Sequence, residues 1–235
     1  MNQHLPLKKP TPLVRLLLLL SATTGMVDAA SILGMDKVFT ANMTGNIVFA
    51  AFAAVGAEGF HMPYYLAALA AFMAGAAIAG RIWRLSPKGR LSHWLVIAAM
   101  VESALLVLAG GLAMLFESSG LRHAALVPVL IALTAGAMGF RNAVVRQLKV
   151  PDLSTTVLTL TITGLASDSH LAGGDGANQR TRLAAVCMIF AGAAAGAALV
   201  IAVGLGPTLL MAGLIVMLAT LLFSLHPQMA ELEKG

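Results

Sequence analysis

Charged residues are scarce in this chain of 235 residues, where Asp, Glu, Lys and Arg together make up 11%. Soluble domains carry about 25%. Hydrophobic residues account for 59%, and the mean hydropathy is +0.88. A chain this apolar cannot present a polar surface to water, which excludes an ordinary soluble domain. The sequence therefore predicts an all-α, polytopic membrane protein whose main partner is the lipid bilayer.

Cysteine and clustered metal ligands are equally scarce. With Cys187 as the single cysteine, no disulfide can form within one chain. The six histidines fall at tails or at the ends of apolar runs, and no pair has zinc-ligand spacing or accompanies a nucleophile motif. We therefore expect no enzyme activity, no metal and no cofactor.

The net charge of +5 does not indicate nucleic-acid binding. The basic residues lie in short gaps between apolar runs, where they set the orientation of membrane helices. The sequence has no basic helix with interleaved aromatic residues. We therefore expect no nucleic-acid partner.

An internal repeat divides the chain into halves. Residues 25–29 (GMVDA) lead to residues 40–45 (TANMTG), and residues 139–143 (GFRNA) lead to residues 159–164 (TLTITG). Both copies read G-x-x-(D/N)-A followed by T-x-x-x-T-G. In membrane proteins, paired halves with interrupted hydrophobic segments are typical of transporters with a site between the halves.

Six apolar runs are each long enough to cross a bilayer, which takes about 20 residues. They are Leu13–Gly34, Met62–Trp83, His93–Phe116, Ala124–Val145, Leu183–Val203 and Thr208–Leu225. Two shorter runs, Thr44–Ala57 and Thr155–Leu171, begin at or near the T-x-x-x-T-G element. A helix of about 14 residues rises only about 21 Å, less than the roughly 30 Å of hydrocarbon.

The loop charges predict how these runs cross. If all eight spanned the membrane, the basic Arg81–Arg90 and Arg146–Lys149 regions would lie outside, against the positive-inside tendency. If the short runs enter and leave on one side, both regions become cytoplasmic, and three crossings per half make the repeat inverted. We therefore predict six spanning helices plus two short re-entrant half-helices. The predicted order is a cytoplasmic tail at 1–12, membrane repeats at 13–116 and 117–225, and a cytoplasmic tail at 226–235.

The starts of the half-helices are the candidate substrate site. Thr at a helix start caps free N–H groups, and Gly allows a turn there. Two half-helices entering from opposite sides would turn their positive N-termini toward each other. The alternative is that these residues only pack helices and satisfy backbone carbonyls. The candidate substrate-binding residues are Thr44, Gly45, Asn46, Thr163, Gly164 and Asn142.

Three ionisable residues inside the predicted spans are candidates for a functional role. Asp28 is flanked by Val27 and Ala29, and acids within a membrane are functional by default. Asn142 occupies the matching position, so the shared role is polar bonding, and Asp28 alone adds a charge. Glu102 is a second candidate for an ion or proton relay. Arg141 either pairs with Asp28 or an anionic solute, or snorkels to the cytoplasmic interface, the favoured interpretation.

Small residues recur at matched places in the two halves. Gly75 and Ala79 correspond to Gly192 and Gly196. Small residues four apart let helix backbones approach closely, either in a homodimer or within one chain.

The run from residues 25–29 through Thr44-Gly45-Asn46 resembles the YoaK family of bacterial integral membrane proteins, and the second element also fits. The resemblance covers nearly the whole chain. It implies a bacterial inner-membrane protein with about six helices, and it supplies no substrate.

The sequence favours a small secondary transporter or channel for a small polar or anionic solute. The alternative is a non-transporting scaffold or partner subunit whose repeat is only structural. In both cases we expect the N- and C-termini to be cytoplasmic.

Overall fold

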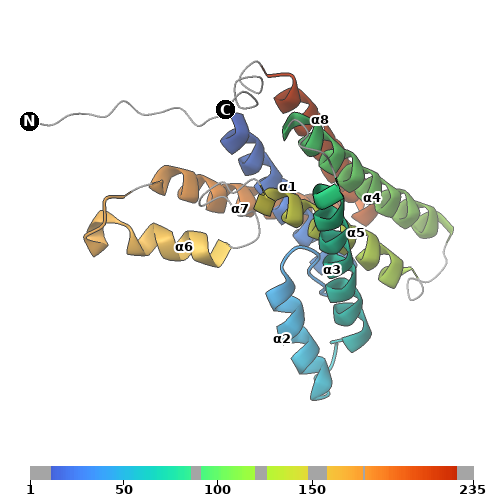
Figure 1. Cartoon of the computed structure of the whole chain (residues 1–235). Helices are drawn as coiled ribbons and strands as arrows, with labels where there is room; N and C mark the ends of the chain where they lie inside the picture. The colour runs from blue at the N-terminus through green and yellow to red at the C-terminus, as the bar shows by residue number, and fades with distance from the viewer. Residues whose placement is uncertain (1–11, 86–90, 120–125, 148–157, 177, 227–235) are drawn as a thin grey trace, which may run out of the picture.

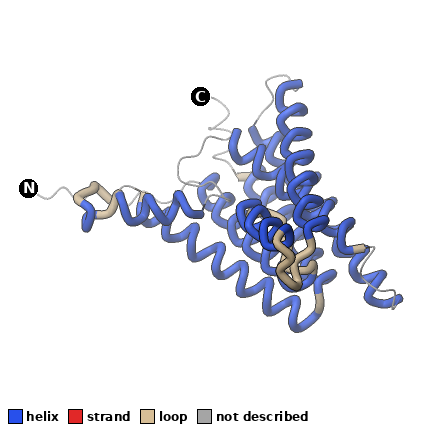
Figure 2. The backbone as a smooth tube through the Cα atoms, turned by 90° about the horizontal axis from the view of Figure 1, so that it is seen from below, coloured by secondary structure: helices blue, strands red, loops and turns tan. Residues whose placement is uncertain are grey.

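The computed structural model describes residues 12–85, 91–119, 126–147, 158–176 and 178–226. Within these ranges the chain consists of helices and loops, without a strand (Figure 2). The predicted tails, apart from Pro12 and His226, lie outside the described residues. So do Lys88, Arg90 and Lys149, which carried part of the topology argument.

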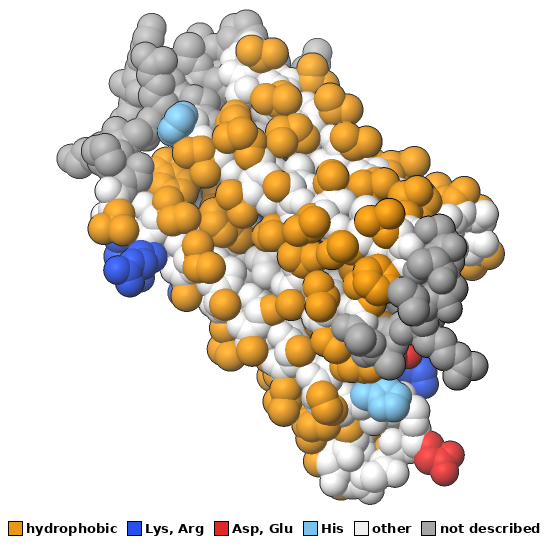
Figure 3. Space-filling view, turned by 90° about the vertical axis from the view of Figure 1, so that its right-hand side faces the viewer, with side chains coloured by type: hydrophobic (Ala, Val, Ile, Leu, Met, Phe, Trp, Pro, Cys, Tyr) orange, Lys and Arg blue, Asp and Glu red, His pale blue; other side chains and the backbone are white. Residues whose placement is uncertain are grey.

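Six described helices are long and apolar enough to cross a membrane, which confirms the predicted number. They are α1 (Pro12–Gly34), α3 (Met62–Leu85), α4 (Leu91–Ser119), α5 (Val127–Gln147), α7 (Gln179–Val203) and α8 (Leu205–Ser224). The short helices are α2 (Met43–Ala54), α6 (Leu158–Ser167) and the single 3-10 turn η2 (His170–Ala172). Hydrophobic side chains cover most of the face in Figure 3, with the charged ones gathered at its ends, as contact with lipid requires.

The helices pair with a two-fold pattern. α1 packs against α7, and its counterpart α5 packs against α3. α4 packs against α8, while α2 lies beside α3 and α6 beside α7, each projecting from the central bundle (Figure 1). If α1, α2, α3 and α4 are exchanged with α5, α6, α7 and α8 in that order, the same packed pairs result. Each half contains three long helices, the odd number of crossings per half that the predicted inverted repeat requires.

Glycines bring the paired helices into backbone contact. A Cβ atom at Gly25 of α1 would overlap the carbonyl oxygen of Ile189 in α7. The matching Gly139 of α5 would overlap the carbonyl oxygen of Phe72 in α3 in the same way. The repeat in the sequence is therefore also a repeat of contacts.

The small residues that the sequence matched are part of the same interfaces. A Cβ atom at Gly192 would overlap the carbonyl oxygen of Ala22, and one at Gly75 would overlap that of Gly136. These contacts lie within one chain, so the intramolecular interpretation accounts for both glycines.

The first short helix begins inside the bundle. Asp28 Oδ1 accepts hydrogen bonds from the backbone N–H groups of Thr40 (3.0 Å) and Ala41 (2.8 Å), directly before α2. Asp28 lies six residues before Gly34, about 9 Å back along α1. The connection after α1 therefore turns back to the depth of Asp28 before α2 starts. With 12 residues, α2 rises about 18 Å, less than a full crossing.

The second T-x-x-x-T-G element is not at the start of its helix. Thr163 and Gly164 lie in the second half of α6, so the prediction that they open the half-helix is wrong. Thr159, near the start of α6, takes the place that Thr44 has in α2. Each short helix has one buried residue among those described, Asn46 in α2 and Thr161 in α6.

The topology gives a direct test. We expect a reporter inserted near Glu58, between α2 and α3, to be external, and one fused near Lys88 to be cytoplasmic, because α2 returns to the side that it entered from. Paired alkaline phosphatase and fluorescent protein fusions measure this. A cytoplasmic Glu58 reporter would contradict both the re-entrant helix and the inverted repeat.

Candidate functional site

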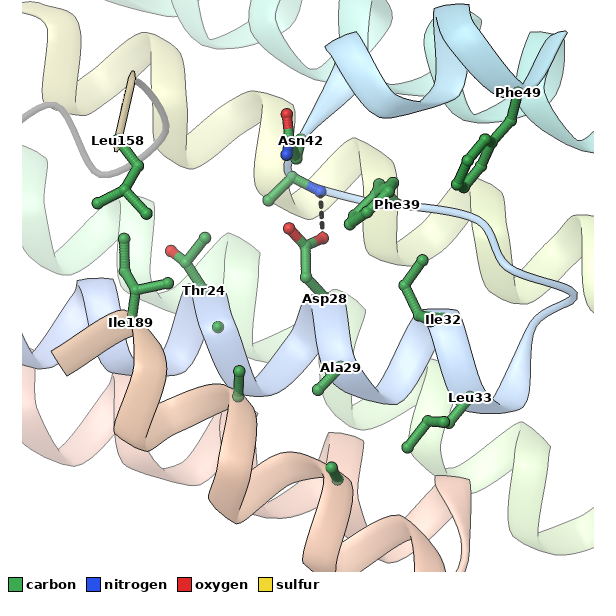
Figure 4. Close-up of a pocket in the computed structure, with 14 residues that line it drawn as sticks. Thr24, Asp28, Ala29, Ile32, Leu33, Phe39, Asn42, Phe49, Leu158 and Ile189 are labelled. Carbon is green, nitrogen blue, oxygen red and sulfur yellow. Dashed lines mark hydrogen bonds between the residues drawn. The ribbon is translucent and has the colours of Figure 1, made fainter. Parts of the chain in front are cut away.

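A cavity of about 610 Å³ lies between α1, α7 and the starts of both short helices (Figure 4). This volume is in the range of small-molecule sites. Most of the wall is apolar. Its polar side chains are Thr24, Asp28 and Asn42; the other lining residues are Gly25, Ala29, Ile32, Leu33, Phe39, Ala41, Phe49, Leu158, Ile189, Ala193 and Ala197.

Asp28 provides the only charge among the lining residues. The side chain is half-buried and extends from α1 toward the segment before α2, as the dashed bond in Figure 4 shows. Both of its backbone hydrogen bonds are accepted by Oδ1. An ionised carboxylate at this depth is costly without a counter-charge, so Asp28 favours binding a proton or a cation.

The two short helices meet at this cavity. Asn42 precedes α2, Leu158 begins α6, and both line the wall. The segment before α2 and the first described residue of α6 therefore lie at one cavity, and neither Asn42 nor Leu158 is among the substrate residues that the sequence predicted.

Phe39 and Phe49 form an aromatic part of the wall. Their rings stack with centroids 5.8 Å apart. Asn46, which is fully buried, fixes Phe39: its Oδ1 accepts from the Phe39 N–H at 2.9 Å, and its Nδ2 donates to the Phe39 carbonyl at 2.6 Å. Asn46 thus holds the wall in place and does not line the cavity.

We expect Asn46→Ala to loosen this segment without unfolding the protein. Losing a backbone hydrogen bond worth about 1 kcal/mol should raise the hydrogen exchange rate of the Phe39 amide by about five- to tenfold. Thr44→Ala, at an exposed position on the same helix, is the matched control and should leave that rate unchanged. Equal exchange in the two variants would show that Asn46 does not fix Phe39.

A buried ion pair lies deeper in the bundle. Arg141 of α5 is 3% exposed and Glu102 of α4 is 2% exposed. Arg141 Nε donates to Glu102 Oε2 at 2.7 Å, and Nη2 donates to Oε1. The favoured prediction that Arg141 snorkels to the interface is therefore wrong, and its ionic partner is Glu102 and not Asp28. Arg141 stays in the interior because α4 supplies a carboxylate at the same depth.

The remaining donors of Arg141 are also used. Nη1 donates to the Leu20 carbonyl (2.9 Å) and to Thr24 Oγ1 (2.8 Å), and Nη2 also donates to Thr23 Oγ1 (3.0 Å). A guanidinium has five N–H groups, and all five have partners here. Arg141 therefore has no donor left for an anionic solute.

Thr24 connects the ion pair to the cavity. It lines the cavity wall and lies one helical turn before Asp28, on the same face of α1. Its Oγ1 accepts the bond from Arg141 and donates to the Leu20 carbonyl at 2.9 Å. Thr24 is thus the side chain between Asp28 and the charges of Arg141 and Glu102.

Several predicted substrate residues lie away from the cavity. Thr44 is exposed, and Gly45 packs against the Phe39 ring. Asn142 is half-buried and has no hydrogen-bond partner among the described residues. Asp28, at the matching position, bonds to the segment before α2. The corresponding segment before α6, residues 148–157, lies outside the described residues.

Gly164, and not Thr163, contacts α7 through a hydrogen bond, which its carbonyl accepts from Arg182. The exposed Thr163 bonds to the Thr159 carbonyl of its own helix. Arg182 Nη1 donates to the Gly164 carbonyl at 2.6 Å and to Asp168 Oδ2 at 2.7 Å. The hydrogen bond from Arg182, helped by one from Ser167, lowers the pKa of Asp168. These residues therefore secure the far end of α6.

Sequence reasoning missed Thr24, Phe39 and Phe49. Thr24 carries a readable signal, since it stands four residues before Asp28 and so shares its helix face. The two phenylalanines carry none, because an aromatic residue in an apolar run is equally suited to core, lipid or cavity.

Comparisons with known proteins place the chain in a family. The family model described as "Protein of unknown function (DUF1275)" matches residues 16–222. The chain is 34% identical over 155 residues to "UPF0700 transmembrane protein YoaK" of Bacillus subtilis (strain 168), a match that covers 65% of each chain and hence less than two thirds of that relative. No solved structure matches. Because the family model spans most of the chain, this protein is a multi-pass membrane protein that belongs to the DUF1275 (YoaK) family.

Proposed function

We propose that this protein is a small secondary transporter whose solute binds in the cavity beside Asp28, in the inner membrane of a bacterium with both termini cytoplasmic. The observation that carries the proposal is the meeting of Asp28 with the starts of both short helices at one cavity. Binding sites between inverted repeats, at interrupted helices, are the recurring design of secondary transporters.

The surroundings of the cavity support a route to the outside. Leu33 lines this cavity and also a second one of about 400 Å³, which Asp36, Leu126 and Gly204 line near the predicted outer ends of the helices. Thr24, at another part of the wall, is bonded to the paired Arg141. The cavity beside Asp28 thus adjoins a second cavity at Leu33 and a buried polar network at Thr24.

The competing function is a membrane scaffold or partner subunit. It is favoured by the hydrogen bonds that Asp28 accepts from the connection before α2, because a purely structural clamp needs no solute. In that case the cavity would be filled by lipid or by another protein, and water would not reach it.

Cysteine labelling separates the two. After Cys187→Ser, we expect Asn42→Cys and Leu158→Cys to react with a small, charged thiosulfonate reagent in intact cells, because both positions line the cavity. Leu160→Cys is the matched control: it is 69% exposed on the same helix as Leu158 but does not line the cavity. We expect Leu160→Cys to be protected by lipid. Protection of both cavity positions would contradict the transporter and favour the scaffold.

A further inference from the structure

The charges around the cavity do not balance. Arg141 is neutralised by Glu102, and its five N–H groups are all engaged. Asp28 bonds to backbone N–H groups, and the cation that attracts it, Arg141, makes its ionic hydrogen bonds with Glu102. The described core therefore carries one uncompensated carboxylate, and it lies at the cavity wall.

Among the described residues, no further charged side chain on the neighbouring elements balances Asp28. α2, α6 and α8 have no charged residue between their described ends. α7 has Arg180 and Arg182 only in its first turn, and the second arginine of α5, Arg146, is in its last turn. In the connection after α1, Asp36 and Lys37 are exposed, and Lys37 lies over the Phe60 ring.

The rest of the wall suits an apolar body. Phe39 and Phe49 present aromatic rings, and Ile32, Ile189 and Ala193 present aliphatic groups. Aromatic faces attract cations, and the attraction is stronger where water is excluded. A carboxylate beside stacked rings in an apolar cavity is thus complementary to a cation that carries hydrocarbon.

We infer that the cavity binds a small organic cation with an apolar body, and that this cation displaces a proton from Asp28. The inference rests on the proposed transport function and names its substrate class. Asp28 holds either the proton or the cation, so one enters the site as the other leaves. The inference of a cation also takes the place of the anionic solute that the sequence had allowed, because Arg141 has no free donor for an anion.

Three probes that share a benzyl group test the substrate class. Benzyltrimethylammonium is a permanent cation, neopentylbenzene replaces its nitrogen by carbon, and phenylacetate is an anion with the same ring. We expect purified full-length protein to bind the cation, and to bind it more weakly as the pH is lowered. Asp28→Asn should weaken cation binding about tenfold or more and leave neopentylbenzene binding unchanged. In weakly buffered solution, the wild type should release protons when the cation binds.

The variants keep the test interpretable. Asparagine retains Oδ1 for the Thr40 and Ala41 N–H groups, and Asn142 already occupies the matching position, so Asp28→Asn should fold. Ala197→Phe fills the cavity without changing a charge and should weaken both the cation and neopentylbenzene.

Equal cation affinity in the wild type and Asp28→Asn, or tighter binding of phenylacetate, would overturn the inference. If the cation does not bind but neopentylbenzene or phenylacetate protects the Asn42→Cys variant from labelling, the substrate class is wrong and the proposed site stands. If no probe binds and the cavity positions do not label, the proposed function fails as well.

Discussion

Replacing Arg141 by methionine should destabilise the protein by about 3–5 kcal/mol, because the carboxylate of Glu102 would stay buried without its counter-charge. Glu102 is 2% exposed, and both of its oxygens accept from Arg141. The hydroxyls of Thr23 and Thr24 would lose a donor as well. Reversible unfolding by SDS in mixed micelles measures the effect.

A double variant separates the lost pair from lost packing. Arg141→Met with Glu102→Leu removes both charges, and we expect it to recover most of the stability, because apolar residues of similar size replace buried ion pairs well. Arg146→Met, one exposed arginine further along the same helix, should change stability by less than about 0.5 kcal/mol. A single variant as stable as this control would show that the pair is not buried in the native protein.

The second large effect concerns the glycine contacts that repeat between the halves. Gly75→Ala and Gly192→Ala should each destabilise the protein by about 2–3 kcal/mol, because each new methyl group meets a backbone carbonyl that cannot rotate away. The two effects should be similar, since the two interfaces are counterparts. The same SDS titration provides the comparison.

A glycine without a neighbour serves as the control. Gly111 has open space around its Cβ direction, whereas the adjacent Gly110 faces the Gly206 carbonyl. We expect Gly111→Ala to be neutral or slightly stabilising, since alanine favours a helix over glycine by about 1 kcal/mol. A large effect in only one of Gly75 and Gly192 would contradict the two-fold arrangement.

The spanning helices were predictable because length and hydropathy are local properties. Each predicted run overlaps one long helix, from Leu13–Gly34 against α1 to Thr208–Leu225 against α8. The inversion stays a prediction from the loop charges, which act on each helix separately.

The environment of Arg141 was not predictable in this way. Whether an arginine near the end of a span snorkels or stays buried depends on which helices surround it. Here Glu102 is 39 residues away in the chain and reaches Arg141 only because α4 packs against α5. The sequence contains both residues but no sign that they meet.

The register of the second half-helix was misread for a related reason. Thr40 follows Asp28 by 12 residues (40 − 28), whereas Thr159 follows Asn142 by 17 (159 − 142). Thr44 follows Asp28 by 16, which is closer to the second value. Because T-x-x-x-T repeats at one helical turn, the motif matches equally well when it is moved by a turn, and only the structure selects the position.

Transport by reconstituted protein tests the central claim most directly. In proteoliposomes with an acidic interior, we expect the wild type to accumulate radiolabelled benzyltrimethylammonium, because each outgoing proton leaves Asp28 free to bring in a cation. A permanent cation cannot be trapped by protonation, so accumulation by weak-base trapping is excluded, and clamping the membrane potential at zero with K+ and valinomycin excludes accumulation driven by the potential. We expect Asp28→Asn vesicles to show no such accumulation. Equal accumulation in the two, or none in the wild type, would contradict a cation–proton exchanger with Asp28 at its site.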